Sequence, residues 1–263
     1  MAFPLLSGSK AIPAVGYGCW KVPKEKCAEL VHEAIRLGYR HIDSASDYGN
    51  EKEVGEGIKR AIDSGLVSRQ DLWVTSKLWN TYHEPQHVKA ACQRSLTDLG
   101  LDYLDLYLIH FPISLKFVPF EKRYPPEWFH DPNAENPKME LISVPVQDTW
   151  RAMEGLVNDN LVKHIGLSNF NAHGLRDVWS YAEIKPSVLH VELHPYLQQW
   201  TLLRFAKSLG LHVTAYSPMG HGASYFNDSI AAIREPVVKD IATKYGKLSN
   251  LEPHLQNEFE NSC

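Results

Sequence analysis

The sequence predicts an α/β fold in the form of a parallel β/α barrel. Apolar, strand-like runs alternate with amphipathic helical stretches at intervals of roughly 30 residues, the length of a βα unit. Runs such as LDLYLIHF are apolar almost throughout, which is typical of parallel strands covered on both faces. Seven rounds of this alternation favour a TIM-type (β/α)8 barrel, in which functional residues lie where strands end and βα loops begin. A chain of 263 residues with 44% hydrophobic content can fill such a core.

The expected strands and helices follow one another along the chain. The strand candidates are residues 15–20, 41–46, 72–79, 104–111, 164–170, 188–194 and 212–219. The helical candidates are residues 24–37, 51–64, 85–99, 146–158, 173–181, 198–209 and about 236–245. An open doubly wound sheet is the alternative, and it usually carries a glycine-rich phosphate loop after its first strand. The nearest candidate, GYGCW, does not open a GxGxxG turn, so the barrel is favoured.

One connection, residues 112–145, is far longer than the others and carries aromatic residues, prolines and charges of both signs. Loops of this length are usually either functional or disordered. Because this one follows the fourth strand at the presumed active end of the barrel, we favour a loop that covers the substrate.

Composition narrows the function classes. The net charge of −4 argues against a surface for nucleic acid or anionic membrane, and no run reaches the ~18 apolar residues of a membrane span. The N-terminus lacks the basic and apolar regions of a signal peptide. Cys19, Cys27, Cys92 and Cys263 show no regular spacing, which favours reduced thiols. We therefore expect a soluble cytoplasmic protein, either a monomer or a homodimer, with a small-molecule substrate.

The stretch GYRHIDSASDYGNEKEVG contains the first candidate catalytic residues. Asp43 lies near the end of an apolar run, and Tyr48 lies in the short loop that follows. An exposed phenol just beyond a strand suggests that its hydroxyl is used. With an ordinary pKa of about 10, the phenol is a poor acid at neutral pH and needs a cation beside it.

Two other strand ends supply partners for this phenol. Lys77 lies in the apolar run LWVTSKLW, where burying an unpaired ammonium would be costly. We expect its side chain to reach the mouth of the barrel, with Asp43 as its counter-ion. His110 ends LDLYLIH, and a lone histidine there is more often structural than catalytic. Its convergence with Tyr48, Lys77 and Asp43 on one face favours a catalytic role.

Together these residues suggest proton transfer at a carbonyl or alcohol oxygen. Lys77 would stabilise the tyrosinate and lower the pKa of Tyr48, while Asp43 would hold Lys77 in place. Tyr48 would then exchange a proton with the oxygen, and His110 would orient the carbonyl. The sequence shows no metal-ligand set, nucleophilic serine or carboxylate pair, so the electrons must come from a bound hydride donor.

The sequence resembles the aldo-keto reductases, and within them the aldose and xylose reductase branch, from about residue 8 to residue 245. GYRHIDSASDYGNEKEVG and VKHIGLSNF match two signature stretches of that family, and KLW, LIHFP, ELHPYLQQ and AYSPMG add support. The resemblance implies a (β/α)8 barrel that uses NADPH, with NADH as an alternative donor, and the four roles given above. Ser168 and Asn169 match residues that bind the carboxamide of the cofactor, and Tyr216 matches the ring that stacks on the nicotinamide. Ser217 and Met219 fall in the loop that contacts the pyrophosphate.

The resemblance also implies a substrate pocket and one altered cofactor contact. Trp20, Trp79 and Phe111 match pocket positions; without the resemblance, Trp20 and Trp79 could equally be core aromatics. Phenylalanine at the third position is typical of xylose reductases, which suggests a sugar- or polyol-related substrate or a small aldehyde or ketone. His190 stands where the family usually has a glutamine that helps hold the carboxamide. We therefore expect weaker or altered positioning of the nicotinamide.

The last residues depart from the family pattern. After Lys247 the family would complete a helix and an eighth strand that contacts the 2′-phosphate of the cofactor, and further helices would follow. The chain instead reads LSNLEPHLQNEFENSC, a polar run without a strand pattern. We therefore expect an incomplete barrel over 1–247, without the eighth strand and the C-terminal helices, and a non-family tail over 248–263. An NAD(P)H-dependent reductase remains the favoured function; the alternatives are a catalytically impaired barrel that binds ligands or partners and an unstable truncated product.

Overall fold

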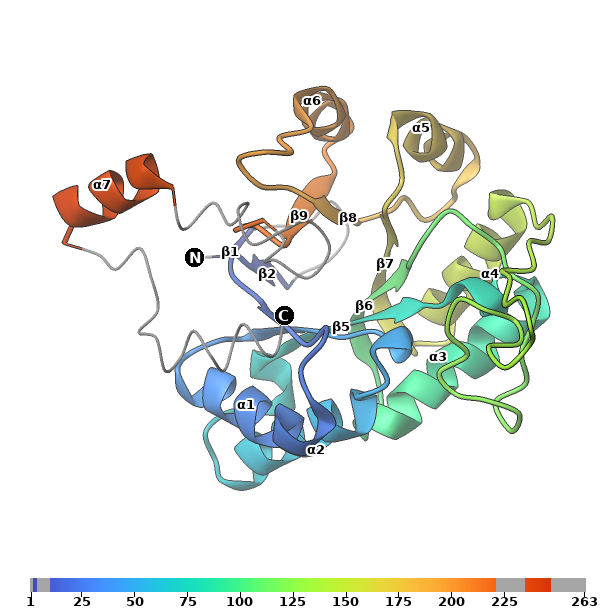
Figure 1. Ribbon diagram of the computed structural model, residues 1–263, viewed down its shortest axis with the longest axis horizontal. Helices are drawn as coiled ribbons and strands as arrows, with labels where there is room; N and C mark the ends of the chain where they lie inside the picture. The colour runs from blue at the N-terminus through green and yellow to red at the C-terminus, as the bar shows by residue number, and fades with distance from the viewer. Residues whose placement is uncertain (1, 4–9, 221–234, 247–263) are drawn as a thin grey trace.

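A seven-stranded parallel sheet forms the centre of the computed structural model, which describes residues 2–3, 10–220 and 235–246 (Figure 1). The strands are paired in the order β3-β4-β5-β6-β7-β8-β9, so that each strand lies beside its predecessor in the sequence. They are β3 (Tyr17–Gly18), β4 (His41–Asp43), β5 (Trp73–Leu78), β6 (Leu104–Ile109), β7 (Val162–Ser168), β8 (Val188–Glu192) and β9 (His212–Tyr216).

The sheet curls into a nearly closed barrel, which confirms the predicted fold class. Within the described residues, β3 and β9 form its two edges. The predicted lack of an eighth strand and of C-terminal helices, like the boundary of the polar tail at residue 248, concerns residues outside the described ranges.

Helices connect successive strands and lie around the outside of the barrel (Figure 1). The helices that connect the strands are α1 (Lys24–Arg36), α2 (Glu51–Asp63), α3 (Pro85–Leu99), α4 (Val146–Asn158), α5 (Ala172–Tyr181) and α6 (Trp200–Ser208), whereas α7 (Pro236–Lys244) comes after β9, the last strand of the described ranges. The predicted bounds of α3 and α4 agree with the structure residue for residue. For α3 the reason is local: Pro85 fits the first turn, and Gly100 ends the helix with a φ of 65°, a left-handed conformation that glycine adopts without strain.

The first strands are shorter than the apolar runs that predicted them. The run 41–46 contributes only His41–Asp43 to the sheet, because the chain then turns into a short 3₁₀ helix at Ser46–Tyr48. Gly49 ends this turn with a φ of 71°. The chain stays buried beyond the end of β4, where Ala45 is also fully buried, so the apolar run is longer than the strand. The turn is what brings Tyr48 back over the end of the barrel.

An N-terminal hairpin that the sequence did not predict packs against the inside of the barrel. Its strands, β1 (Ala2–Phe3) and β2 (Ile12–Pro13), are antiparallel and have two residues each, too few to show a periodic pattern. Ile12 joins a small buried cluster inside the barrel, whose other members are Trp73, Leu106, Leu108 and Val188. Because Trp73 and Val188 begin their strands, Ile12 of β2 lies at the amino end of the barrel, opposite the carboxyl end that holds the site.

The long connection between β6 and α4 is folded back onto the barrel. Its two arms meet at a bridge between Leu115 and Leu141, beside an ion pair of 2.8 Å between Lys116 and Glu140. At its centre, Trp128 packs against Trp79 at the end of β5, with 4.8 Å between ring centroids. The connection therefore forms part of the wall at the carboxyl end of the barrel, which fits the predicted covering loop.

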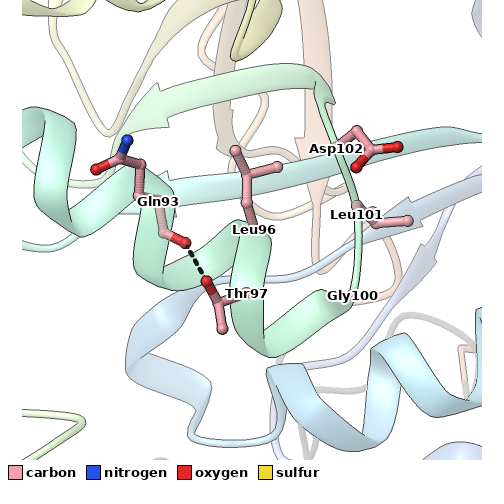
Figure 2. Close-up of a pocket in the computed structure, with 6 residues that line it drawn as sticks. All are labelled: Gln93, Leu96, Thr97, Gly100, Leu101 and Asp102. Atoms are coloured by element: carbon pink, nitrogen blue, oxygen red, sulfur yellow. Dashed lines mark hydrogen bonds between the residues drawn. The ribbon is translucent and has the colours of Figure 1, made fainter.

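A surface hollow of about 440 Å³ lies at the opposite end of the barrel. Its lining comes from the end of α3, including Gln93 and Thr97, and from the turn into β6, which ends at Asp102 (Figure 2). This turn leads into the amino end of a strand, whereas the candidate catalytic residues lie at or just beyond the carboxyl ends of strands. The hollow is therefore separate from the candidate site.

Two further observations concern the described ranges alone. None of their helices is long and apolar enough to cross a membrane. Cys19, Cys27 and Cys92 are buried and unpaired. Burial raises the pKa of each of these thiols above its ordinary value, so all three are protonated at neutral pH.

Candidate active site

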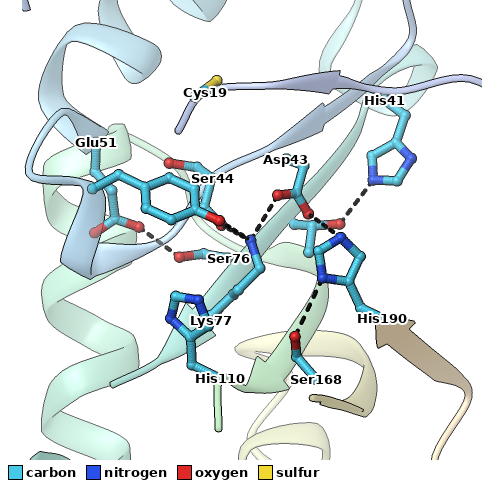
Figure 3. A network of polar contacts seen from close by, with 12 residues as sticks. Cys19, His41, Asp43, Ser44, Glu51, Ser76, Lys77, His110, Ser168 and His190 are labelled. Carbon is cyan, nitrogen blue, oxygen red and sulfur yellow. Dashed lines mark hydrogen bonds and ion pairs between the residues drawn. The ribbon is translucent and has the colours of Figure 1, made fainter. Parts of the chain in front are cut away.

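Lys77 is the centre of the candidate site. It lies near the carboxyl end of β5 and is completely buried. Its ammonium donates to Asp43 Oδ1 at 2.6 Å, to the carbonyl oxygen of Ser44 at 2.8 Å and to the hydroxyl of Tyr48 at 3.0 Å (Figure 3). The predicted counter-ion of Lys77 is therefore present, and all three donor positions of the ammonium are used.

The ion pair between Lys77 and Asp43 keeps both groups charged. Burial opposes the charge of Lys77, but Asp43 and Tyr48 outweigh it and raise the pKa of the ammonium above its ordinary value. Burial likewise opposes the carboxylate of Asp43, but Lys77 and, less strongly, His190 lower the pKa of that carboxyl. A buried pair of this kind is stable only as a unit, because either charge alone would be left without a partner.

The pKa of Tyr48 corrects one prediction. We expected Lys77 to lower this pKa below its ordinary value of about 10. In the structure, burial raises the pKa of Tyr48 to about 12, because the removal of water from the phenol outweighs the attraction of Lys77. Lys77 does act in the expected direction, but it offsets the effect of burial only in part. Tyr48 is therefore fully protonated at neutral pH and can act as a proton donor.

His110 follows β6 and faces Tyr48, as the convergence argument predicted. The centroids of the two rings are 5.9 Å apart, and the indole of Trp79 approaches the imidazole from another side at 5.3 Å. Burial and, next, the Lys77 ammonium lower the pKa of His110 well below its ordinary value. The imidazole is therefore neutral, and one of its nitrogens can donate a hydrogen bond.

A second polar cluster lies at the ends of the next strands. The amide of Asn169 donates to the carbonyl oxygen of His110 at 2.9 Å and to Ser168 Oγ at 3.2 Å, and its oxygen accepts from the Tyr216 hydroxyl at 2.7 Å. Asn169 has a φ of 62°, and Ser217, after β9, has a φ of 48°. Left-handed backbone at non-glycine residues is uncommon and concentrates at functional sites. The structure thus brings Ser168, Asn169 and Tyr216 together and places Ser217 and the exposed Met219 in the turn beyond them.

His190 lies between this cluster and the ion pair. Its Nδ1 is 3.3 Å from Ser168 Oγ, and its Nε2 is 3.8 Å from Asp43 Oδ2. Burial lowers the pKa of His190 to about 4, although Asp43 acts in the opposite direction. The imidazole is therefore neutral at physiological pH.

Aromatic side chains form a wall beside His110. Trp79 is fully buried and donates from its indole nitrogen to the carbonyl oxygen of Glu127 at 3.2 Å. Phe111 stacks on His110 and packs edge-on against Trp79 and Trp128. Trp20 lies at the end of β3 and is 43% exposed, so it is not a core aromatic. Trp79 is both a core residue and part of this wall.

Sequence reasoning missed two residues near the site. Trp128 completes the aromatic wall, and the signal that could have found it is the group of aromatic residues in the long connection. Glu51 is a buried carboxyl that accepts from Ser76 Oγ at 2.6 Å (Figure 3) and from Ser95 Oγ at 2.9 Å. It looks like an ordinary first-turn acid of α2 in the sequence, and no local pattern distinguishes it.

The fold and the arrangement of the site are those of a β/α-barrel oxidoreductase. In the described part of the chain, no group of three or more His, Cys, Asp or Glu side chains is placed to hold a metal ion. The Aldo/keto reductase family matches residues 7–245, and the chain belongs to this family.

Curated relatives are similar over most of the chain. An NADPH-dependent D-xylose reductase of Meyerozyma guilliermondii is 49% identical over 241 residues, which cover 92% of this chain and 73% of the relative. An NADPH-dependent aldose reductase of Saccharomyces cerevisiae is 51% identical over 218 residues, which cover 82% of this chain and 66% of the relative.

Solved structures show the same fold. The aldose reductase from Schistosoma japonicum has a TM-score of 0.82 and 39% identity, and the alignment covers 95% of this chain and 76% of that one. The Bombyx mori aldo-keto reductase in complex with NADP has a TM-score of 0.81 and 34% identity over 95% of this chain and 78% of that one.

Proposed function

We propose that this chain reduces aldehydes or ketones of sugar or polyol type to alcohols with NADPH, and that Tyr48 is the proton donor. The observation that carries the proposal is the hydrogen bond of 3.0 Å between the Tyr48 hydroxyl and the buried ammonium of Lys77. NADH is the alternative hydride donor. The relatives that are NADPH-dependent D-xylose and aldose reductases support both the reaction and the substrate class.

The residues present fit a nicotinamide cofactor. Ser168 and Asn169 place a hydroxyl and an amide next to each other, and the oxygen of each keeps an acceptor position for the N–H groups of a carboxamide. The ring of Tyr216 lies beside them, tied to Asn169 by its hydroxyl, and offers a flat face for stacking. Ser217 and Met219, in the turn after β9, are the candidates for contacts to the pyrophosphate. His190 completes the cluster on the side of the ion pair.

NADPH, when bound, supplies the hydride. Tyr48 supplies the proton: it is fully protonated at neutral pH, and the tyrosinate left after transfer is stabilised by the Lys77 ammonium. Asp43 keeps Lys77 charged and in place. Neutral His110 orients the carbonyl oxygen by donating a hydrogen bond, and it does not compete with Tyr48 as an acid because its lowered pKa leaves the imidazole without the extra proton at neutral pH.

The aromatic wall of Trp79, Phe111 and Trp128 encloses the reacting carbonyl and excludes water from it. Trp20 would contact the substrate from the rim of the barrel. The apolar wall and the polar groups of Tyr48 and His110 together suit an aldehyde or ketone. Its oxygen would face Tyr48, and its carbon chain would lie along the rings of the wall.

The test compares wild type with Tyr48→Phe in NADPH oxidation with D-xylose and a broad panel of aldehydes. General acid–base residues typically contribute about 10²- to 10⁴-fold, so kcat/KM should fall by that factor while NADPH affinity, followed by tryptophan fluorescence, stays close to wild type. Tyr103→Phe is the matched control, because Tyr103 packs against Arg69, far from the site. Equal, slow rates for wild type and Tyr48→Phe on the whole panel would refute the assignment. Repeating the assay with NADH would decide which donor is used.

A further inference from the structure

One oxygen of the central ion pair lacks a hydrogen bond. Asp43 Oδ1 accepts from Lys77, whereas Oδ2 is buried and has no hydrogen-bond partner within the described residues. Burying a carboxylate oxygen without a hydrogen-bond donor costs free energy, so we ask which polar group lies close enough to Oδ2 to reduce that cost. Nε2 of His190 lies 3.8 Å from this oxygen.

The hydrogen bonds around His190 favour one of its two neutral tautomers. Asn169 uses its amide hydrogens toward the His110 carbonyl oxygen and Ser168 Oγ. Ser168 therefore accepts from Asn169, and its own hydrogen is free to be donated to Nδ1 of His190, 3.3 Å away. A neutral imidazole has one donor and one acceptor nitrogen. With Nδ1 accepting, the hydrogen is on Nε2 and points toward the carboxylate of Asp43.

The opposite tautomer is unfavourable. It would turn the lone pair of Nε2 toward the carboxylate oxygen Asp43 Oδ2, so that two groups with lone pairs would face each other without a hydrogen between them. The titratable groups that face His190 are Asp43 and His41 from β4, Lys77 from β5, His110 after β6 and Tyr216 from β9. Burial keeps His190 neutral among them, with a pKa of about 4.

We propose that His190 is a positioning residue that joins the two halves of the site: Nε2–H restrains Asp43, and Nδ1 restrains Ser168. A continuous polar chain then runs from Tyr216 through Asn169, Ser168 and His190 to Asp43, and from there through Lys77 to Tyr48. Its consequence is that one side chain influences both the cofactor side and the proton-donor side. For its kinetic part this inference rests on the proposed function.

His190→Phe removes both nitrogens and keeps a ring of similar size. Because it frees both Asp43 and Ser168, we expect a fall of about tenfold in kcat together with a rise of about tenfold in the KM for NADPH, the size of effect typical of losing one intramolecular hydrogen bond. His190→Gln keeps one acceptor and one donor and should return both constants close to wild type. His164→Phe is the matched control: His164 is also a buried strand histidine, but it stacks on Trp73 at the other end of the barrel.

A readout independent of activity is the nitrogen NMR spectrum of protein labelled at histidine, with the His190 signals assigned by their absence from His190→Gln. We expect a neutral imidazole protonated at Nε2 near pH 7. Protonation at Nδ1, or His190→Phe kinetics no different from those of His164→Phe, would overturn the inference. Failure of the proposed function would give a different result, because wild type would then reduce no carbonyl substrate. In that case the role of His190 would still be decided by which of its nitrogens is protonated and by the effect of His190→Phe on NADPH affinity.

Discussion

The buried pair of Asp43 and Lys77 allows a quantitative test of how the site is held together. Lys77 Nζ lies 2.6 Å from Asp43 Oδ1, and the side chains are 1% and 15% exposed. Charges within about 4 Å attract by about 4 kcal/mol at an effective dielectric constant of about 20. The perturbation is a double-mutant cycle of Asp43→Asn, Lys77→Met and the combination of both.

Each single substitution leaves the other charge buried without its partner. Removing one member of a buried pair typically costs about 3–5 kcal/mol, and we expect each single variant to lose unfolding free energy in this range. The double variant buries no unpaired charge, so it should lose less than the sum of the two single losses, with a coupling energy of about 3 kcal/mol. All three variants should lose most of their reductase activity, since the Tyr48 hydroxyl loses either the Lys77 ammonium itself or the carboxylate that holds this ammonium beside it.

Urea unfolding near pH 7, followed by tryptophan fluorescence, measures the four free energies of unfolding. The exposed pair of Glu33 and Arg36 on α1 is the control, and its cycle should show little coupling because water and salt screen exposed charges. Additivity of the two single losses to within about 0.5 kcal/mol would refute the argument that the pair acts as a unit.

Two further predictions concern the residues that sequence reasoning missed. Burial raises the pKa of Glu51 from 4.5 to about 7, so the folded chain keeps a proton that the unfolded chain releases, and stability falls as pH rises between those values. Glu51→Gln should therefore flatten the pH dependence of the free energy of unfolding and raise that free energy by up to about 3 kcal/mol near pH 8. Glu56→Gln, on the exposed side of α2, is the control and should leave the pH dependence unchanged. Identical curves for wild type and Glu51→Gln would show that burial does not raise the pKa of Glu51. Trp128→Ala removes the ring that packs against Trp79, and we expect kcat/KM for aldehydes to fall about threefold to tenfold, the worth of an aromatic pair, with the KM for NADPH unchanged. The exposed Trp200 supplies the control Trp200→Ala, and an equal effect of the two substitutions in steady-state kinetics would contradict a pocket role for Trp128.

Much of the fold could be predicted because its signals are local. The apolar runs that became β5 and β6 are buried at every position, and helices α3 and α4 begin and end where the pattern and the flanking residues place them. The two-residue strands of the N-terminal hairpin gave no such signal, because two residues cannot display a period. The shortened strand β4 was not visible either, since burial of the chain continues after its ladder ends.

The candidate site shows the same division. The sequence by itself determined that Lys77 needs a counter-ion, because an ammonium in an apolar strand cannot be buried alone, and the structure supplies Asp43. It did not determine the pKa of Tyr48, because the cost of removing water from the phenol depends on how completely neighbouring elements cover it.

Tertiary structure alone decided the contacts between residues far apart in the chain. Trp128 meets Trp79 only because the long connection folds back, and His190 approaches Asp43 only because the curved sheet brings β8 toward β4 across the barrel. Propensity and periodicity act over a few residues and therefore specify elements. Distances across the barrel depend on how all the strands pair and curve together, so the link between the two halves of this site is a property of the fold.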